Sequence, residues 1–176
     1  MNRSSIGTGA SAGVPDGQGD SFGRLNAAIL AQFGVEPGWR FGGRRQASWS
    51  EMDPFGHVNN IAYLVYFEDA RNAYLEHCGL PRLSAQTPGP VLVESRQEYV
   101  RPLAHGDRIL VTARTVGLGR TSLRMEYAVW RDGLIARGAI TAVLMISATD
   151  RKVAIPPDLR ASVERLEGRT LRARPR

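Results

Sequence analysis

Cysteine is nearly absent from this sequence. Its 176 residues contain one cysteine, Cys78, which excludes an internal disulfide framework and any zinc or iron–sulfur site built from cysteine ligands. No stretch offers the roughly 18 uncharged apolar residues that a membrane-spanning helix needs. The N-terminal residues also lack the apolar core of about 7–15 residues that a secretory signal requires. We therefore expect a cytoplasmic protein.

Lysine is almost missing as well, because Lys152 is the only one and arginine carries nearly all of the positive charge. The formal net charge is +6, and the excess is concentrated in residues 160–176, which hold six arginines and two glutamates. The rest of the chain is close to balanced, so the basicity does not mark the whole protein as a nucleic-acid binder. We expect residues 169–176 to be a solvated basic tail, and we expect no nucleic acid and no membrane as partners.

Length and apolar content favour one folded domain. A hydrophobic share of 43% over 176 residues is ordinary for a globular protein with a single core. Residues 1–38 are expected to form a flexible arm, rich in glycine and serine at first, with a possible short helix at 24–33. The folded domain is expected at 39–168, and the basic tail follows at 169–176.

The order of the periodic segments predicts the architecture. A long apolar helix is expected at 61–78, with Asn59 and Asn60 at its start and Gly79 at its end. Alternation of period two predicts the strands, and Asp132–Gly133 is a strong hairpin signal. The expected strands are 44–50, 91–100, 108–116, 121–131 and 134–147, and a final short helix is expected at 158–166.

A single long helix has to cover one face of this sheet. The helix at 61–78 is apolar around most of its first two turns, which indicates that it is enclosed. We therefore predict an α+β domain in which a five-stranded antiparallel sheet curls around one long central helix. The strand at 134–147 is apolar on both faces and should be an interior strand. The open edge and the other face of the sheet predict a homodimer or homotetramer.

The segment that leads into the long helix resembles a known family. Residues 53–71, DPFGHVNNIAYLVYFEDAR, resemble the signature of hotdog-fold acyl-CoA thioesterases of the 4-hydroxybenzoyl-CoA thioesterase type. The similarity continues through Arg101-Pro102-Leu103, Gly119-Arg120-Thr121-Ser122 and Ile155-Pro156, and covers about residues 41–160. It implies the hotdog fold, hydrolysis of an acyl-CoA or acyl-carrier thioester without a cofactor, and a site at the boundary between subunits.

The chemistry of thioester hydrolysis explains why these residues matter. It needs a carboxylate that attacks the acyl carbon or activates water, and donors for the oxyanion. Asp53 precedes Asn60 by seven residues, and the first turn of a helix presents unpaired N–H groups at its positive end. The resemblance implies that Asp53 is the nucleophile or general base, that the Asn60 N–H binds the oxyanion and that Tyr63 lines the acyl pocket. The residues expected to contact substrate are Gly56, where the backbone can approach closely, Val58, Asn59, Tyr63, Glu68, Thr121 and Ser122.

Three of these residues have a structural alternative. His57 would orient Asp53 or contact the substrate, or else it is a histidine packed between the loop and the helix. Asn59 would contact substrate or cap the helix. Glu68 is the second candidate for the catalytic carboxylate, or it forms an ion pair with Arg71 three residues later.

The sequence offers no metal site but several arginines that could bind phosphate. His57, His77 and His105 show no ligand spacing, so we expect no metal. No Gly-x-Ser-x-Gly elbow is present, which argues against a serine hydrolase. The candidates for the phosphates of coenzyme A are Arg96, Arg101, Arg120 and Arg124.

Two rival functions fit the same resemblance. A hotdog dehydratase or isomerase would pair Asp53 with His57 and act on carbon next to the thioester. A non-catalytic hotdog protein would sense acyl-CoA and regulate transcription, which requires a DNA-binding helix-turn-helix, and residues 1–38 offer at most one short helix.

Overall fold

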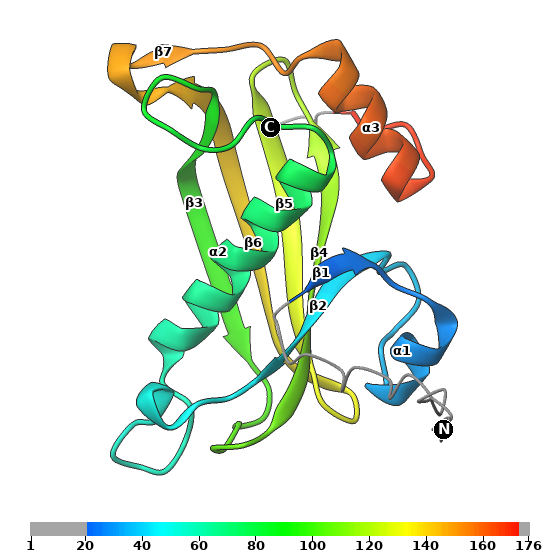
Figure 1. Cartoon of the computed structure of the whole chain (residues 1–176), viewed down its shortest axis with the longest axis vertical. Helices are drawn as coiled ribbons and strands as arrows, with labels where there is room; N and C mark the ends of the chain where they lie inside the picture. The colour runs from blue at the N-terminus through cyan, green and yellow to red at the C-terminus, as the bar shows by residue number, and fades with distance from the viewer. Residues whose placement is uncertain (1–20, 173–176) are drawn as a thin grey trace, which may run out of the picture.

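The computed structural model describes residues 21–172 (Figure 1). The glycine-rich part of the expected arm and the last four residues of the expected tail lie outside these described residues. The helices are α1 (Ala27–Gln32), α2 (Asn60–His77) and α3 (Pro157–Glu167). The strands are β1 (Phe22–Arg24), β2 (Phe41–Gln46), β3 (Gly89–Tyr99), β4 (Arg108–Leu118), β5 (Ser122–Trp130), β6 (Leu134–Ile146) and β7 (Arg151–Lys152).

The strands form one antiparallel sheet in the order β1-β2-β4-β5-β6-β3, with β7 paired to the end of β6. The sheet has seven strands, so the expectation of five was wrong. The two additional strands are β1, with three residues, and β7, with two, and so few residues do not produce a readable alternation. β6 lies between β5 and β3, which confirms that it is an interior strand.

The start of the sheet also differs from the expectation of a strand at 44–50. β2 ends at Gln46, and Trp49–Glu51 form a 3₁₀ turn instead. The Ser48 backbone N–H donates to the Glu51 carboxylate at 2.8 Å, which closes a capping box around this turn. The capping box therefore ends the strand before Asp53 is reached.

The sheet curls around α2 (Figure 1). Asn59 caps the helix by accepting the Ile61 N–H at 2.9 Å, and Gly79, with φ +98°, ends it. One side of α2 is buried against the sheet, where the Phe67 ring stacks on Tyr127 with centroids 5.3 Å apart. Burying each such side chain stabilises the fold by about 1.5–3 kcal/mol. The buried side chains of α2 are Ala62, Tyr63, Tyr66, Phe67, Ala70, Arg71, Tyr74 and Leu75.

A second, smaller cluster covers part of the face of the sheet that points away from α2. Phe33 and Trp39, from the segment around α1, pack there on Trp130 and its neighbours. The Trp39 and Trp130 rings meet edge to face at 5.9 Å, and the Trp130 indole N–H donates to the Thr112 hydroxyl at 2.9 Å. This face is therefore partly covered by the chain's own N-terminal segment. The sequence analysis assigned it only to solvent or to another subunit.

The two ends of the described chain are attached to the sheet. β1 lies in the part of the sequence that was expected to be a flexible arm, and it pairs with β2 of the domain. At the other end, Leu171 is buried, and its N–H donates to the Glu164 carboxylate at 2.9 Å. The expected basic tail therefore begins with residues that pack on the domain.

Gly138 of β6 offers a test of how closely α2 packs. A Cβ added there would lie 2.8 and 2.9 Å from two carbons of the Phe67 ring. We expect Gly138→Ala to lower the free energy of unfolding by about 1–3 kcal/mol, measured by urea denaturation, because the ring must move. Gly23→Ala is the control, since nothing lies within 4 Å of its added Cβ. Equal stabilities for the two variants would contradict this packing.

Candidate active site

The loop at residues 52–58 places Asp53 just before α2, at the lower end of the molecule in Figure 1. Met52 and Val58 form a bridge across the base of the loop, and the Asp53 N–H donates to the His57 carbonyl at 2.7 Å. One Asp53 carboxylate oxygen accepts the Phe55 N–H at 2.8 Å and the His57 N–H at 3.0 Å. The carboxylate is thus fixed by main-chain donors of its own loop, and it is partly exposed. Gly56, with φ +80°, is required by the left-handed turn.

The start of α2 leaves the Asn60 N–H group available. The Ile61 N–H is bound by the Asn59 side chain, and the Ala62 N–H by the Asn59 carbonyl at 3.0 Å. The Asn60 N–H has no hydrogen-bond acceptor within residues 21–172. It lies at the positive end of an 18-residue helix, where an anionic oxygen is favoured. The two groups singled out by the sequence, the Asp53 carboxylate and the Asn60 N–H, thus lie on a loop and on the helix start that directly follows it.

Three other predicted residues have structural roles in this chain. Asn59 is the helix cap, as one of its two interpretations required. Val58 is buried in the hydrophobic core, and its N–H donates to the Leu103 carbonyl at 2.8 Å. Glu68 is exposed and pairs with the buried Arg71 at 3.2 Å. Each of these three residues therefore has a role in the fold that needs no bound ligand.

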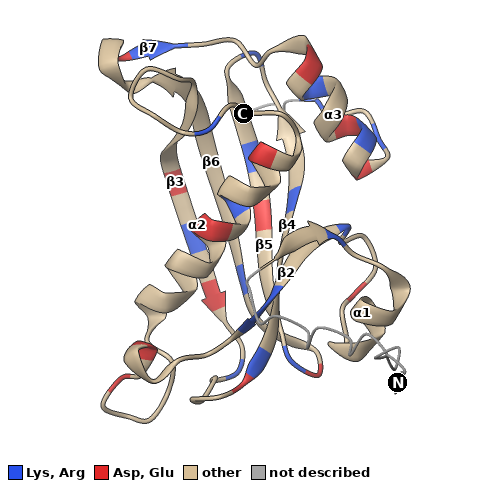
Figure 2. Ribbon diagram, viewed as in Figure 1, with Lys and Arg blue, Asp and Glu red and all other residues tan. Residues whose placement is uncertain are grey.

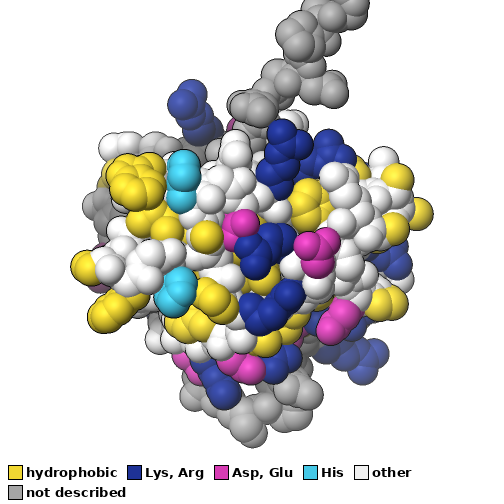
Figure 3. All heavy atoms as spheres, turned by 90° about the horizontal axis from the view of Figure 1, so that it is seen from below, with side chains coloured by type: hydrophobic (Ala, Val, Ile, Leu, Met, Phe, Trp, Pro, Cys, Tyr) yellow, Lys and Arg dark blue, Asp and Glu magenta, His cyan; other side chains and the backbone are white. Residues whose placement is uncertain are grey.

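His57 lies on the loop with an exposed side chain. Its hydrogen bonds to Asp53, among the described residues, run through its main chain and not through its imidazole. It is therefore neither packed between loop and helix nor bonded to the carboxylate through its ring. Seen from this end of the molecule, two histidine side chains lie among apolar groups, next to a cluster of basic and acidic side chains (Figure 3).

Tyr63 is buried beside the start of α2, and its ring contacts those of Tyr66 and Tyr99 at centroid distances of 5.8 and 5.2 Å. Burial raises the pKa of Tyr63 to about 12, and the neighbouring Tyr99 adds to the increase. The phenol therefore stays protonated at neutral pH. Burial also raises the pKa of the Cys78 thiol to about 12, which makes this cysteine an unsuitable nucleophile.

Thr121 and Ser122 do not join this site within one chain. They lie at the turn between β4 and β5, at the upper end of the sheet in Figure 1, where the Leu144 N–H donates to the Thr121 carbonyl at 2.8 Å. The Asp53 loop lies at the lower end. These two residues can approach an Asp53 carboxylate only if it belongs to another protomer.

The candidate arginines differ in their availability. Arg101 donates to the main-chain carbonyls of Arg131, Asp132 and Leu134 at 2.9–3.1 Å, so its guanidinium holds the β5–β6 hairpin. Arg96 and Arg120 are exposed.

Within residues 21–172, no three histidine, cysteine, aspartate or glutamate side chains are grouped closely enough to hold a metal ion. None of the helices there is long and apolar enough to cross a membrane.

The sequence analysis missed Glu51, which ties the loop to α2. Its carboxylate accepts the Tyr66 hydroxyl at 2.6 Å, and its carbonyl accepts the Asn59 N–H at 2.8 Å. Arg45 lies 3.5 Å from the same carboxylate and 4.6 Å above the Tyr66 ring. The spacing Ser48-x-x-Glu51 is the signal that could have identified this residue.

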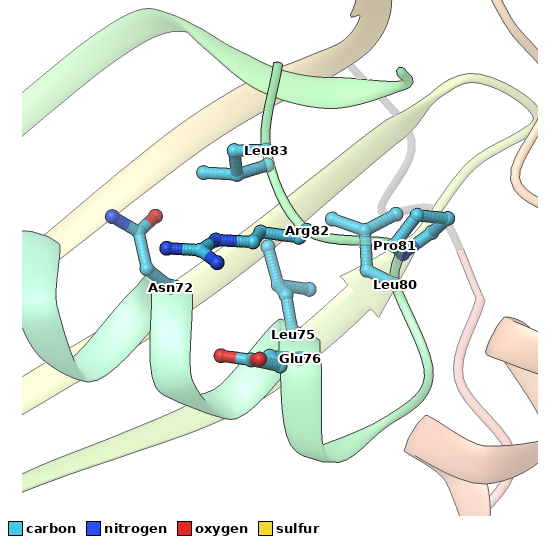
Figure 4. A pocket seen from close by; sticks show the side chains of 7 residues that line it. All are labelled: Asn72, Leu75, Glu76, Leu80, Pro81, Arg82 and Leu83. Carbon is cyan, nitrogen blue, oxygen red and sulfur yellow. The ribbon is translucent and has the colours of Figure 1, made fainter.

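A separate hollow of about 210 Å³ lies at the opposite, C-terminal end of α2 (Figure 4). Leu75, Leu80 and Leu83 supply its apolar side chains, and the Arg82 guanidinium extends between Asn72 and Glu76 at its open side. None of its lining residues belongs to the Asp53 loop, so this hollow is not part of the Asp53 site within one chain.

The fold and the loop together define a class of protein. A curled antiparallel sheet around one long helix, with the Asp-x-x-Gly-His-Val-Asn-Asn segment at the start of that helix, is the hotdog fold of thioesterases. Residues 47–163 match the sequence profile of the Thioesterase-like superfamily. The chain therefore belongs to this superfamily.

Relatives with known sequences and structures agree with this assignment. A 1,4-dihydroxy-2-naphthoyl-CoA hydrolase from Rippkaea orientalis is 32% identical over 114 residues, which are 63% of this chain and 78% of that protein. The uncharacterized protein YsmA of Bacillus subtilis is 29% identical over 79 residues, which are 45% of this chain, and the match spans about half of YsmA, 53%.

Two solved structures extend the likeness to the whole fold. A thioesterase superfamily protein from Jannaschia superimposes with a TM-score of 0.76 at 27% identity, covering 85% of this chain and 96% of that one. A Thermus thermophilus thioesterase, complexed with coenzyme A and zinc, superimposes with a TM-score of 0.69 at 34% identity, covering 77% of this chain and all of that one.

The tie between Glu51 and α2 can be tested through Tyr66. We expect Tyr66→Phe to lower the free energy of unfolding by about 1.5–3 kcal/mol, because it removes a hydrogen bond to a charged group. Tyr99→Phe is the control, since Tyr99 is half exposed and its change should stay within about 0.5 kcal/mol. Urea denaturation monitored by circular dichroism measures both, and a Tyr66→Phe change as small as the control's would argue against the tie.

Proposed function

We propose that this protein hydrolyses an acyl-CoA or acyl-carrier thioester to the free acid and the thiol. The observation that carries the proposal is the pairing of a fixed carboxylate with a free N–H donor. Asp53 is held by two main-chain N–H groups of its loop, and the Asn60 N–H has no acceptor among the described residues. A thioester carbonyl docked on Asn60 would have its acyl carbon on the side of the Asp53 loop.

Each group then has a definite task. The Asp53 carboxylate either takes a proton from water as the water attacks the acyl carbon, or attacks that carbon itself and forms an anhydride that water cleaves. The carbonyl oxygen becomes negative and is stabilised by the Asn60 N–H and the positive end of α2. Collapse of the tetrahedral species breaks the carbon–sulfur bond. In the general-base route the sulfur receives the proton that Asp53 took from water; in the nucleophilic route it leaves as a thiolate that takes a proton from solvent, and water then cleaves the anhydride to the free acid and Asp53.

Glu68 is the weaker candidate for the catalytic carboxylate. It lies on α2, past the first two turns, and its carboxylate pairs with Arg71 at 3.2 Å. Arg71 is buried, so removing Glu68 would leave a buried cation without this partner. A structural role explains Glu68 fully.

Two relatives support a substrate class for this protein. The Thermus thermophilus structure contains coenzyme A, and the Rippkaea orientalis relative is named as an acyl-CoA hydrolase. Both support a coenzyme A thioester for this chain. The polar end of such a substrate would meet the exposed Phe55 and His57 side chains of the loop.

We also propose that the active form is a homodimer that joins two copies through the free edge of β3. All of residues 91–96 on this edge strand are exposed, and so are Ile61, Leu64 and Val65 on the side of α2 that the sheet does not cover. An open edge leaves backbone N–H and C=O groups unpaired, and an apolar helix face exposes hydrophobic side chains to water. Pairing of β3 with its copy about a two-fold axis would cover both. Antiparallel pairing reverses the second protomer. The hollow at the C-terminal end of its α2 then lies toward the first protomer's Asp53 loop, where it can receive the acyl group.

Replacing Asp53 tests the proposed chemistry. Asp53→Asn keeps an oxygen that accepts the loop N–H groups and removes the charge, so we expect turnover of acyl-CoA to fall by at least about 10²-fold with folding retained. Release of free thiol across a panel of acyl-CoA esters measures turnover. Glu68→Gln is the matched control and should cost less.

Three outcomes would overturn parts of this proposal. Near-native turnover in Asp53→Asn together with loss in Glu68→Gln would transfer the role to Glu68. Conversion of the acyl group to an unsaturated thioester without thiol release would identify a dehydratase. Release of no thiol from any acyl-CoA or acyl-carrier substrate would reject hydrolysis.

The proposed dimer has its own test. Val65→Lys places a charge on the exposed apolar side of α2, so we expect a shift from dimer to monomer at equal concentration, measured by light scattering. Ala161→Lys, at an exposed position of α3, is the control and should leave the dimer intact. A wild-type protein that is monomeric and fully active at the assay concentration would contradict the proposal.

A further inference from the structure

A second large hollow, of about 510 Å³, lies on the face of the sheet that points away from α2. Its floor is formed by β4 and β5, where Arg124 and Glu126 alternate with the core residues Met125 and Tyr127. One wall is the chain at Gly38–Arg40, and the other is the C-terminal end of α3. Figure 2 shows basic residues on α3 and on the strands beside it. We call it the arginine hollow, after its four arginines Arg40, Arg114, Arg124 and Arg169.

The two carboxylates that line the arginine hollow are already engaged. Glu126 accepts two hydrogen bonds from Arg114, at 2.9 and 2.6 Å. Glu167 is buried, and its carboxylate accepts the Tyr74 hydroxyl at 2.5 Å and the Thr115 N–H at 3.0 Å. Glu126 is paired with Arg114, and Glu167 is held by two neutral donors and forms no ion pair with an arginine among the described residues.

Four arginines and two carboxylates line the hollow, which leaves an excess of two positive charges there. Arg40, Arg124 and Arg169 form no ion pair with any residue between 21 and 172. Arg124 is half buried in spite of this, which is costly for a guanidinium without an anionic partner. The three side chains come from β5, from the segment before β2 and from the segment after α3, so the fold and not one charged run of sequence brings them together.

A glycine makes room for one of these arginines. A Cβ on Gly168 would lie 2.7–3.0 Å from the Arg40 guanidinium, so a side chain there would push it aside. Gly168 has φ +67° and ends α3, whose negative end favours the nearby cation.

We propose that the arginine hollow binds a small molecule through a phosphate ester or diphosphate group. Guanidinium groups bind phosphate oxygens through paired, charge-assisted hydrogen bonds, and three of them around one hollow fit a multiply charged anion better than a carboxylate. None of the lining residues belongs to the Asp53 loop, so the site is additional to the proposed catalytic one. The proposal stands independently of thioester hydrolysis.

The test is a calorimetric titration of the full chain with inorganic pyrophosphate at constant ionic strength. We expect saturable binding at one site per chain, weakened at least about tenfold, or 1.4 kcal/mol, in Arg124→Gln and in Arg169→Gln. Arg151→Gln makes the same change in charge at an exposed position on β7, outside the hollow, and should stay within about twofold. Unchanged melting temperatures show that the variants are folded. Asp53→Asn should bind pyrophosphate normally, which separates this site from the catalytic proposal.

Further arms identify the source of the phosphate. Loss of coenzyme A affinity in the same two variants, with unchanged hydrolysis of a phosphate-free N-acetylcysteamine thioester, supports the site and assigns the phosphate to the substrate. Coenzyme A affinity that does not depend on these arginines supports the site with a separate phosphorylated ligand. No saturable pyrophosphate binding, or an equal loss in Arg151→Gln, would overturn the proposal. So would tight binding of a DNA duplex that depends on the same arginines in place of pyrophosphate.

Discussion

Enclosure of α2 is the constraint on which the rest of this structure depends. The first two turns of the helix are apolar around most of their circumference, and the sheet curls to cover one side of it, with a glycine where the two come closest. Gly138 is the clearest case, because the Phe67 ring occupies the space of a side chain there. The same packing fixes where α2 begins, and thereby fixes the position of the Asn60 N–H, which has no acceptor within residues 21–172.

The loop before α2 is rigid for local reasons. Glu51 holds the Tyr66 hydroxyl and the Asn59 N–H, while Asp53 and His57 bind one another through the main chain. The carboxylate is therefore oriented by the main-chain N–H groups of Phe55 and His57, and no hydrogen bond from the His57 imidazole to it is seen among the described residues. The loop's own main-chain N–H groups hold the Asp53 carboxylate, and the Asn59 cap fixes where the loop ends and α2 begins.

The sequence was informative where a pattern extends over many residues. The long helix and the four longest strands follow from periodicity, and the Asp-x-x-Gly-His-Val-Asn-Asn segment identified the family. Strands of two or three residues carry no period, so β1 and β7 were missed. A linear motif also does not tell which end of the sheet a residue occupies, and Thr121 and Ser122 proved to lie far from the Asp53 loop. Val58 looked like a ligand contact because of its neighbours, although its side chain belongs to the core.

The way the loop is fastened has a consequence for how this protein can change over evolutionary time. Pro54, Phe55 and His57 expose their side chains, while the fold holds the loop by its main chain and by Asp53. Substitutions at these three positions alter the surface that an incoming molecule meets and leave the carboxylate where it is. A single substitution at one of these positions can thus change which molecules the loop contacts without destabilising the fold.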